Sequence, residues 1–265
     1  MNEYFKNKVV WVTGASSGIG EEIAKQVANA EGTVILSSRN IEKLLVIKQN
    51  LKSPDKHLIF QLDLENLDNV TARFDELWKS VGSIDYFFNN GGVSQRGEAH
   101  STPIEVDRKI MEIDYFGNIT LTKLILPFFQ SQKHGHIVVM SSIAGKFGFY
   151  LRSAYSAAKH ALHGFYESLR LEEAKNNLKV TLICPGKINT PISTNAIGAD
   201  GEKHGVMDHN QATGMSVEDC VSRILSAVSK NKKEALIGNK EIMAVYLKRY
   251  CPAIFYRVIR KQSAV

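Results

Sequence analysis

The sequence predicts an α/β protein with a single doubly wound domain, in which a seven-stranded, mostly parallel sheet is flanked by helices. Short apolar runs alternate with segments of helical spacing along the whole chain. The runs are apolar at consecutive positions, which indicates strands that are covered on both faces. The first run ends in a glycine-rich turn that opens the first helix, an arrangement typical of nucleotide-binding β–α units.

Each predicted element follows from this periodicity. The expected strands lie at 9–12, 33–36, 58–62, 86–88, 137–140, 180–183 and 235–237. The expected helices lie at 19–30, 41–51, 67–81, 103–132, 155–176 and 217–229. Pro103 stands at the start of the long fourth helix, and Pro127 is expected to interrupt it. The chain contains no linker and no internal repeat, so we expect residues 1–265 to form one domain. This domain is expected to include a substrate loop at 187–214 and a C-terminal helical tail at 240–261.

Composition excludes several classes of protein. The 265 residues are 44% hydrophobic and 23% charged, as in soluble globular proteins. The net charge of +6 fits a solvated surface and an anionic cofactor, because the basic residues are not interleaved with aromatics as in nucleic-acid readers. Three widely spaced cysteines, Cys184, Cys220 and Cys251, predict neither a disulfide framework nor a metal site. Without an apolar run of about 18 residues, a cytoplasmic protein is expected, at most peripheral to a membrane.

A glycine-rich segment, Thr13 to Gly20, lies between the first predicted strand and the first helix. Such spacing also occurs in ordinary strand-to-helix turns, but this position favours a phosphate cradle. Gly14 permits a tight turn, Gly18 a close approach of the backbone, and Gly20 close packing of helix on strand. A pyrophosphate would lie over the free N–H groups of the helix. The predicted dinucleotide contacts are Gly14, Ser16, Ser17, Gly18, Ile19 and Gly20.

The residues after the second strand select the cofactor. An acidic side chain there would accept a hydrogen bond from the ribose 2′-OH of NAD, but the chain has Ser37-Ser38-Arg39-Asn40. Arg39 can bind a 2′-phosphate through two hydrogen bonds, and Ser38 can donate another. We therefore expect Ser38, Arg39 and Asn40 to bind cofactor and NADP(H) to be preferred over NAD(H). The glycine segment contains no basic residue to assist, so the preference is expected to be incomplete.

Tyr155 and Lys159 lie four residues apart on a predicted helix, so their side chains share a face. A lysine ammonium beside a phenol favours the phenolate, which makes the tyrosine a usable proton donor or acceptor near neutral pH. Ser142 follows the fifth strand, and its hydroxyl could hold a carbonyl oxygen beside Tyr155; Ser141 is the competing candidate. Together with the glycine segment, these residues predict hydride transfer to a carbonyl.

This combination of motifs resembles the classical short-chain dehydrogenase/reductase family over residues 8 to about 190. The matching elements are the glycine segment, Asp63-Leu64, Asn89-Asn90-Gly91, Ser142, Tyr155 with Lys159, and Pro185-Gly186 followed by Thr190. The resemblance implies one extended Rossmann domain that exchanges hydride between NAD(P)(H) and a carbonyl or alcohol.

The resemblance also implies roles for individual residues. Asp63 and Leu64 would border the adenine, and Asn90 and Gly91 the ribose. Lys159 would also hold the nicotinamide ribose. Pro185 and Gly186 would complete the cofactor site, with Ile188 and Thr190 touching the carboxamide.

Two positions depart from the family pattern. Gly91 stands where the family usually has alanine, which should be tolerated because small size is what matters there. Asp114 stands where the family has a catalytic asparagine that helps to hold a water between the lysine and solvent. Part of that role belongs to a main-chain carbonyl in a distorted helix turn, which aspartate could keep. An ionised Asp114 near Lys159 would make Tyr155 harder to ionise, so we expect an altered pH profile and not an inactive enzyme.

The tail mixes apolar with basic side chains and is divided by Pro252. Residues 244–255 resemble the C-terminus of the dehydrogenase/reductase member 7B group, which is related to the hydroxysteroid dehydrogenases. Residues 141–146 and 115–117 fit the same group. Its substrates tend to be lipophilic ketones, steroids, retinoids or acyl chains. The tail could cap the substrate pocket or a subunit interface, or lie on an anionic membrane surface as a basic amphipathic segment.

These observations predict an NADP(H)-dependent oxidoreductase that acts on a small lipophilic ketone or aldehyde. The predicted catalytic residues are Ser142, Tyr155, Lys159 and Asp114. The loop at 187–214 is expected to close over substrate and to become ordered only then. The resemblance implies a homodimer or homotetramer. The alternative is a non-catalytic NADP(H) sensor or scaffold, which Asp114 favours and the Ser142, Tyr155 and Lys159 set does not.

Overall fold

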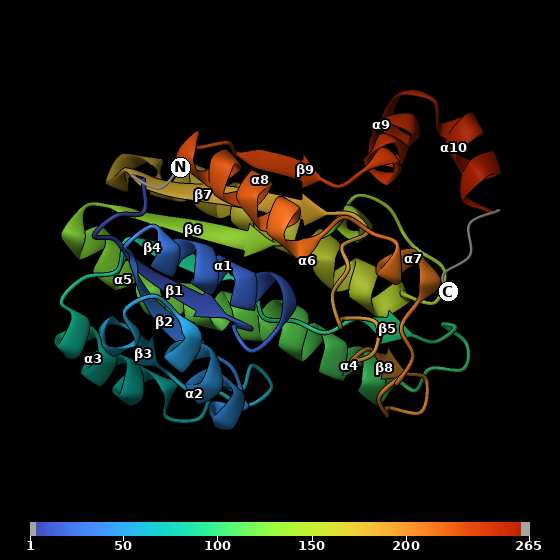
Figure 1. The fold of residues 1–265 in the computed structure, drawn as a ribbon. Helices are drawn as coiled ribbons and strands as arrows, with labels where there is room; N and C mark the ends of the chain where they lie inside the picture. The colour runs from blue at the N-terminus through green and yellow to red at the C-terminus, as the bar shows by residue number, and fades with distance from the viewer. Residues whose placement is uncertain (1–3, 261–265) are drawn as a thin grey trace.

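Seven parallel strands form the central sheet of the computed structural model, which describes residues 4–260 (Figure 1). The spatial order is β3-β2-β1-β4-β6-β7-β9, and every neighbouring pair is parallel. The strands are β1 (Val9–Thr13), β2 (Thr33–Ser37), β3 (Leu58–Ile59), β4 (Tyr86–Asn89), β6 (Gly135–Met140), β7 (Leu178–Pro185) and β9 (Glu234–Ile237). The predicted fold class is thus confirmed, although β3 is shorter than the expected run at 58–62.

Helices cover both faces of this sheet and enclose two separate apolar cores. Successive residues of β1 point to opposite faces, so Val10 and Val12 belong to one core and Trp11 to the other. The first core lies under α1 (Gly18–Asn29), α2 (Ile41–Asn50) and α8 (Val217–Ser229). The second lies under α3 (Val70–Val81), α5 (Gly117–Gln132) and α6 (Ser153–Glu172). This double cover explains why the strands are apolar at consecutive positions.

The long fourth helix is interrupted near Asp114 and not at Pro127. It consists of α4 (Ile104–Met111), a π-helical turn at Glu112–Phe116, and α5. Pro127 lies inside α5 on its exposed side, where the carbonyl that loses its partner can face water, so the expected interruption there is wrong. The π turn places the distorted backbone beside the carboxyl ends of the strands.

Two segments extend this framework. The loop at 187–214 contains β8 (Ile197–Gly198), which pairs with β5 (Gln95–Arg96), and the short helix α7 (His209–Ala212). The tail forms α9 (Met243–Tyr250) and α10 (Pro252–Ile259), which lie beyond the end of β9 (Figure 1). Residue 261, at the end of the predicted tail, lies outside the described part. No helix within residues 4–260 is long and apolar enough to cross a membrane.

Candidate active site

The site forms where the order of the sheet changes direction, at the carboxyl ends of β1 and β4. The Thr13 hydroxyl accepts hydrogen bonds from the backbone N–H groups of Asn90, at 3.0 Å, and Gly91, at 2.9 Å. The Asn90 amide donates to the Thr13 carbonyl at 2.9 Å. These bonds hold the glycine turn after β1 against the turn after β4, so both sides of the cleft are fixed.

The glycine segment has the shape of a phosphate cradle. Gly14 adopts φ +64°, a conformation that L side chains rarely adopt. A Cβ on Gly20 would lie 2.3 Å from the Gly14 carbonyl oxygen, so only glycine lets the start of α1 pack on the turn. A Cβ on Gly91 would crowd the end of the flexible Leu64 side chain at 2.6 Å and meet its other neighbours at ordinary contact distances, so glycine or alanine suits this position. The cradle fits the pyrophosphate of a dinucleotide, with its free N–H groups at the N-terminus of α1.

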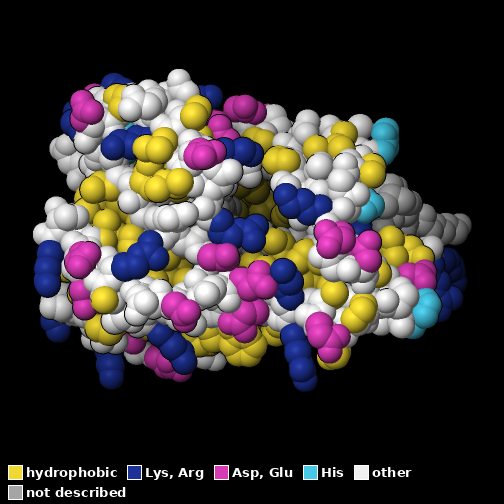
Figure 2. Space-filling view, turned by 90° about the horizontal axis from the view of Figure 1, so that it is seen from below, with side chains coloured by type: hydrophobic (Ala, Val, Ile, Leu, Met, Phe, Trp, Pro, Cys, Tyr) yellow, Lys and Arg dark blue, Asp and Glu magenta, His cyan; other side chains and the backbone are white. Residues whose placement is uncertain are grey.

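A cavity of about 400 Å³ lies over this cradle. The predicted cofactor residues that line it are Gly14, Ser16, Ser17, Gly18, Ile19, Ser38, Arg39, Asn40, Asp63, Leu64, Asn90, Gly91 and Thr190. Gly20 is instead packed beneath the turn. The face seen in Figure 2 is hollowed near its middle, and Lys and Arg side chains lie beside the hollow.

The end of the cavity beside β2 is basic. Arg39 and Lys43 both line it, and the backbone between them begins α2. Asn40 caps that helix, because its side-chain oxygen accepts a hydrogen bond from the Lys43 N–H at 2.8 Å. Sequence reasoning missed Lys43, which lies in the first turn of α2, whereas Arg39 precedes the Asn40 cap and lies outside the helix.

A second, smaller cavity of about 100 Å³ continues the first, and Ile19, Asn90 and Thr190 line both. The predicted residues that line it also include Ser142, Tyr155, Lys159, Pro185, Gly186 and Ile188. The structure therefore brings together residues from the turn after β6, from α6, and from the end of β7 with the segment that follows it.

Tyr155 and Lys159 lie one turn apart on α6, and both are buried. The Lys159 ammonium is 5.5 Å from the centre of the Tyr155 ring and donates a hydrogen bond to the Met140 carbonyl at 3.2 Å. The bond to the end of β6 fixes where the charge lies. The ammonium is thus close enough to act on the phenol electrostatically.

The two candidate serines face different partners. The Ser141 hydroxyl is buried and contacts His163 Nε2 at 3.0 Å and the Lys159 carbonyl at 3.2 Å. The Ser142 hydroxyl accepts a hydrogen bond from the Ala144 N–H at 3.1 Å and lies 3.4 Å from the Pro185 carbonyl. Both serines line the smaller cavity, but the Ser141 hydroxyl is engaged with His163 and the Lys159 carbonyl, so the geometry favours Ser142 as the hydroxyl that meets a ligand.

Asp114 lies in the π turn behind this cavity and is fully buried. One carboxylate oxygen accepts a hydrogen bond from the Val93 N–H at 2.7 Å, and the other is 3.6 Å from the Lys159 ammonium. Burial raises the pKa of the Asp114 carboxyl, and the charge of Lys159 opposes that rise. The expected proximity of Asp114 and Lys159 is therefore present, although Asp114 does not line the cavity itself.

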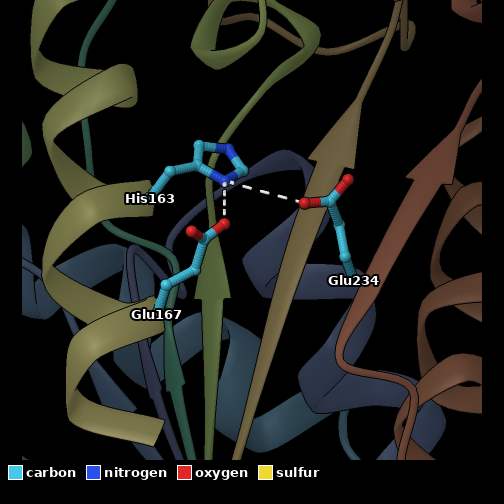
Figure 3. A group of neighbouring side chains, drawn as sticks. All are labelled: His163, Glu167 and Glu234. Atoms are coloured by element: carbon cyan, nitrogen blue, oxygen red, sulfur yellow. Dashed lines mark ion pairs between the residues drawn. The ribbon is translucent and has the colours of Figure 1, made fainter. Parts of the chain in front are cut away.

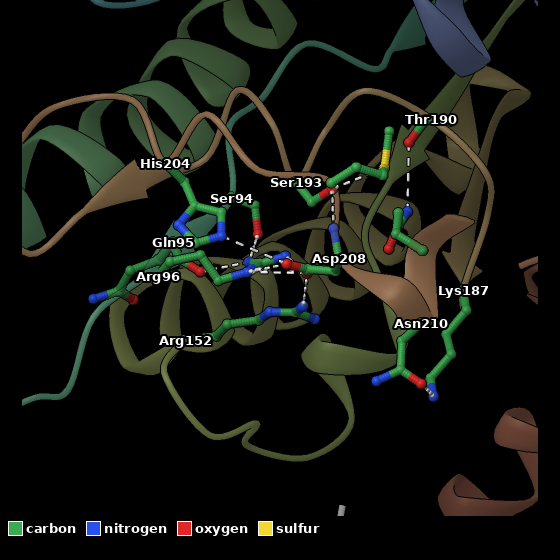
Figure 4. Close-up of polar contacts among 12 residues, drawn as sticks. Ser94, Gln95, Arg96, Arg152, Lys187, Thr190, Ser193, His204, Asp208 and Asn210 are labelled. Carbon is green, nitrogen blue, oxygen red and sulfur yellow. Dashed lines mark hydrogen bonds and ion pairs between the residues drawn. The ribbon is translucent and has the colours of Figure 1, made fainter. Parts of the chain in front are cut away.

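The substrate loop rests on the body of the protein through a buried ion pair that sequence reasoning missed (Figure 4). Asp208 of the loop accepts hydrogen bonds from Arg96 Nε at 3.1 Å and from Arg152 Nη2 at 3.2 Å. The loop thus has regular elements and a fixed contact with the body, unlike the expected segment that becomes ordered only on closing. Asp208 and Arg96 are 112 residues apart, so no local pattern could have revealed the pair.

A histidine and two glutamates meet between α6 and the neighbouring strands of the sheet (Figure 3). His163 Nδ1 lies 3.8 Å from both Glu167 and Glu234. The Lys146 ammonium lies in the same group, 3.2 Å from His163 Nδ1 and 2.5 Å from Glu234. This ammonium supplies the positive charge that the carboxylates attract, so we interpret the group as an ion-pair network and not as a metal site.

The strand order, the glycine cradle at the switch point and the adjacent Tyr–Lys pair define a Rossmann-type dinucleotide-binding protein. A sequence profile of the family described as short chain dehydrogenase matches residues 8–200. The chain belongs to this family, whose members are oxidoreductases that bind a nicotinamide cofactor.

Similar proteins extend over nearly the whole chain. It is 40% identical over 266 residues to a mouse protein named dehydrogenase/reductase SDR family member 7B, covering 98% of this chain and 82% of the mouse protein. It is also 40% identical over 267 residues to a dehydrogenase/reductase SDR family protein 7-like from Anopheles gambiae, covering 98% and 84%.

Solved structures show the same fold. A short-chain dehydrogenase from Streptomyces avermitilis has a TM-score of 0.80 and 26% identity, covering 96% of both chains. A short-chain dehydrogenase/reductase from Burkholderia phymatum in complex with NAD has a TM-score of 0.82 and 20% identity, covering 95% of this chain and 96% of that one.

Proposed function

We propose that the protein is an NADP(H)-dependent oxidoreductase that interconverts a carbonyl and a secondary or primary alcohol. The observation that carries this proposal is that Ser142, Tyr155 and Lys159 line one cavity, which continues the nucleotide cleft. A protein that only bound a nucleotide would need the cleft but not these three side chains beside it.

The cofactor proposal rests on the basic end of the cleft. Ser38, Arg39 and Lys43 line it where a ribose 2′-phosphate would lie, and the N-terminus of α2 favours an anion there. The cradle of Gly14 to Gly20 would hold the pyrophosphate, Asp63 and Leu64 would border the adenine, and Asn90, Gly91 and Lys159 would border the riboses. Pro185, Gly186, Ile188 and Thr190 would surround the nicotinamide. When bound, the cofactor supplies or accepts the hydride.

The side chains would handle the proton. The Ser142 hydroxyl would donate a hydrogen bond to the substrate oxygen, and the Tyr155 phenol would give it a proton during reduction. Lys159 would stabilise the phenolate that remains, because its ammonium lies beside the ring. The Asp114 carboxylate, 3.6 Å from the Lys159 ammonium, would moderate the effect of that positive charge on the phenol. In alcohol oxidation the Tyr155 phenolate would act as the base.

A lipophilic substrate is supported by a third cavity, of about 680 Å³, beneath the tail helices. Apolar side chains dominate its lining, among them Ile143, Phe147, Leu247 and Phe255. Ile143 follows Ser142 directly in the chain, although the two cavities share no lining residue. The tail would cap this apolar space, which could take the apolar body of a ketone or aldehyde.

The tail also offers a surface for weak contact with an anionic membrane. Its exposed large side chains are Met243, Tyr246, Tyr250, Ile254, Tyr256 and Val258. Basic residues are interspersed among them, namely Lys248, Arg249, Arg257 and Arg260. Flotation with anionic liposomes, with and without residues 241–265, tests this contact; equal flotation contradicts it. We further propose a homodimer or homotetramer through α4, α5 and α6, because Ile104 of α4, Phe116 of the π turn before α5 and Leu171 of α6 are exposed. Sedimentation of a monomer at micromolar concentration would contradict that assembly.

Asp114 is the observation that favours a second function, a nucleotide sensor without turnover. One assay separates the two functions. The purified protein is mixed with NADPH or NADH and a panel of ketones and aldehydes, and oxidation of the cofactor is followed by absorbance. We expect NADPH oxidation with apolar carbonyl compounds. Tight NADPH binding without turnover of any compound would favour the sensor.

A further inference from the structure

The N-terminus of the catalytic helix is capped by a residue that is distant in sequence. The Gln95 side-chain oxygen accepts hydrogen bonds from the backbone N–H groups of Ala154, at 2.8 Å, and Tyr155, at 3.2 Å. The first N–H groups of a helix have no partner within the helix itself. Arg152, the residue at the N-cap position of α6, makes no side-chain capping bond. Gln95 therefore satisfies the groups that a local cap would normally satisfy.

The chain reaches α6 through a backbone that is itself held in place by the neighbours of Gln95. Leu151 adopts φ +61°, a left-handed conformation that is unfavourable for leucine. The Gly97 N–H donates a hydrogen bond to the Leu151 carbonyl at 3.1 Å, and Gly97 pairs with Arg152 in a parallel bridge. The segment 95–97 thus supports both the turn before α6 and the first turn of the helix.

The other edge of the same segment holds the substrate loop. In the register of β5 with β8, Gln95 is paired with Ile197, and Arg96 with Gly198. Arg96 is also the partner of Asp208 in the buried ion pair (Figure 4). The two-residue strand β5 therefore lies between the loop and the catalytic helix and contacts both.

We propose that Gln95 is a positioning residue for Tyr155, and that β5 transmits the seating of the substrate loop to this tyrosine. One of the two N–H groups bound by Gln95 belongs to Tyr155, so loss of the bond would displace the Tyr155 backbone relative to Lys159, one turn further along. Gln95 itself is fully buried and does not reach the reacting atoms. This inference rests on the proposed function, since it concerns the tyrosine to which proton transfer is assigned.

The test compares two substitutions of Gln95. Gln95→Met keeps the size of the side chain and removes the acceptor, whereas Gln95→Glu keeps the acceptor. The Gln95 amide nitrogen has no hydrogen-bond partner among the described residues, so oxygen in its place breaks no bond. We expect kcat to fall by about 100-fold in Gln95→Met, as for a misplaced catalytic group, with the KM for NADPH unchanged. Gln95→Glu should stay within about threefold of the parent, and hydrogen exchange at the amides of Ala154 and Tyr155 should accelerate only in Gln95→Met.

A control and a second variant keep the result interpretable. Gln130→Met removes a partly buried bond of 2.8 Å to Glu173, away from the site, and should change neither kcat nor exchange at Tyr155. Should Gln95→Met fold poorly, Gln95→Asn, whose amide is one carbon shorter, should show the same loss of kcat. If kcat in either variant equals that of the parent while exchange at the Ala154 and Tyr155 amides is faster, Gln95 only caps the helix and does not position Tyr155 for catalysis. That result would overturn the proposal.

The outcome is separable from that of the proposed function. If the parent reduces no carbonyl compound, the proposed function fails. Two measurements still report on Gln95: hydrogen exchange at the backbone amides, and the pH titration of the Tyr155 absorbance. The Tyr155 absorbance is obtained as the difference between each protein and its Tyr155→Phe variant. Gln95→Met adds no charge, so a shift of that titration in this variant would report a displaced Tyr155. An unshifted titration in Gln95→Met would overturn the proposal.

Discussion

The carboxylate of Asp114 lies 3.6 Å from the ammonium of Lys159, and both side chains are buried. The backbone that carries Asp114 is a π turn, and the Val93 N–H fixes the orientation of the carboxylate. An ionised Asp114 would place a negative charge beside this ammonium and would partly offset the positive field of Lys159 at the Tyr155 ring. The pair therefore links Asp114, one of the two departures from the family pattern, to the proposed proton transfer.

Replacement of Asp114 by asparagine should change the pH dependence of the reaction. The amide removes the negative charge beside Lys159, so the Tyr155 phenolate forms more readily. Reduction needs the protonated phenol, so the decline of the rate at alkaline pH should begin at a lower pH in Asp114→Asn than in the parent. The measurement is kcat/KM for ketone reduction from pH 6 to about pH 10.

Asp107→Asn provides the control for that experiment. Burial also raises the pKa of Asp107, which lies on α4 and does not line the cavity. Its pH–rate curve should follow that of the parent. Superimposable curves for Asp114→Asn and the parent would show that Asp114 carries no charge relevant to the reaction.

The neighbouring serines provide a matched pair. Ser142→Ala removes the hydroxyl that would hold the substrate oxygen, and kcat should fall by about 100- to 1,000-fold with little change in NADPH binding. Ser141→Ala removes only the contacts with His163 and the Lys159 carbonyl, and activity should stay within a few-fold. The reverse order of the two losses would assign the role to Ser141.

Cofactor preference depends on the basic end of the cleft. Arg39→Leu should lower affinity for NADPH by roughly 10- to 100-fold, because a charge-assisted pair of hydrogen bonds to the 2′-phosphate is lost, and should leave NADH nearly unaffected. Lys43→Leu should have a smaller effect of the same sign. Calorimetric titration with both cofactors measures the ratio, and an unchanged ratio in Arg39→Leu would refute NADP(H) preference.

His163 should make the protein sensitive to acid. Burial, followed by the charge of Lys146, lowers its pKa to about 4 from an ordinary value of 6.5. Between these values the unfolded chain binds a proton that the folded chain does not, so the free energy of unfolding falls as pH drops through this window. From pH 7 to pH 5 the loss from this group is about 2 kcal/mol. Urea unfolding should show that His163→Asn loses less stability over this range than the parent does; equal losses would exclude His163 as a source.

Much of the fold could be predicted from the sequence because local patterns determine it. Consecutive apolar residues such as Val10, Trp11 and Val12 predict strands covered on both faces, and the structure places them in two cores. The interruption of the fourth helix could not be predicted in this way. Pro127 gave a local signal but is accommodated on an exposed face, whereas the π turn at Asp114 has no breaker residue.

The site was predictable where a motif has fixed spacing, as for Tyr155 and Lys159, which share one face of α6. It was not predictable where contacts join distant segments. The bonds of Gln95 to α6 span about 60 residues, and the pair of Arg96 with Asp208 spans 112. The direction of a side chain could not be predicted either, because only the structure shows which atoms the Ser141 and Ser142 hydroxyls contact.

The central claim is that Tyr155 transfers the proton in a reaction that uses NADP(H). The most direct measurement is the rate of NADPH oxidation by Tyr155→Phe with a ketone that the parent reduces, alongside calorimetric titration of NADPH. We predict loss of turnover by at least 1,000-fold, of the order expected for loss of a general acid, with the affinity for NADPH unchanged. Turnover within about tenfold of the parent would contradict the account, because another group would then supply the proton.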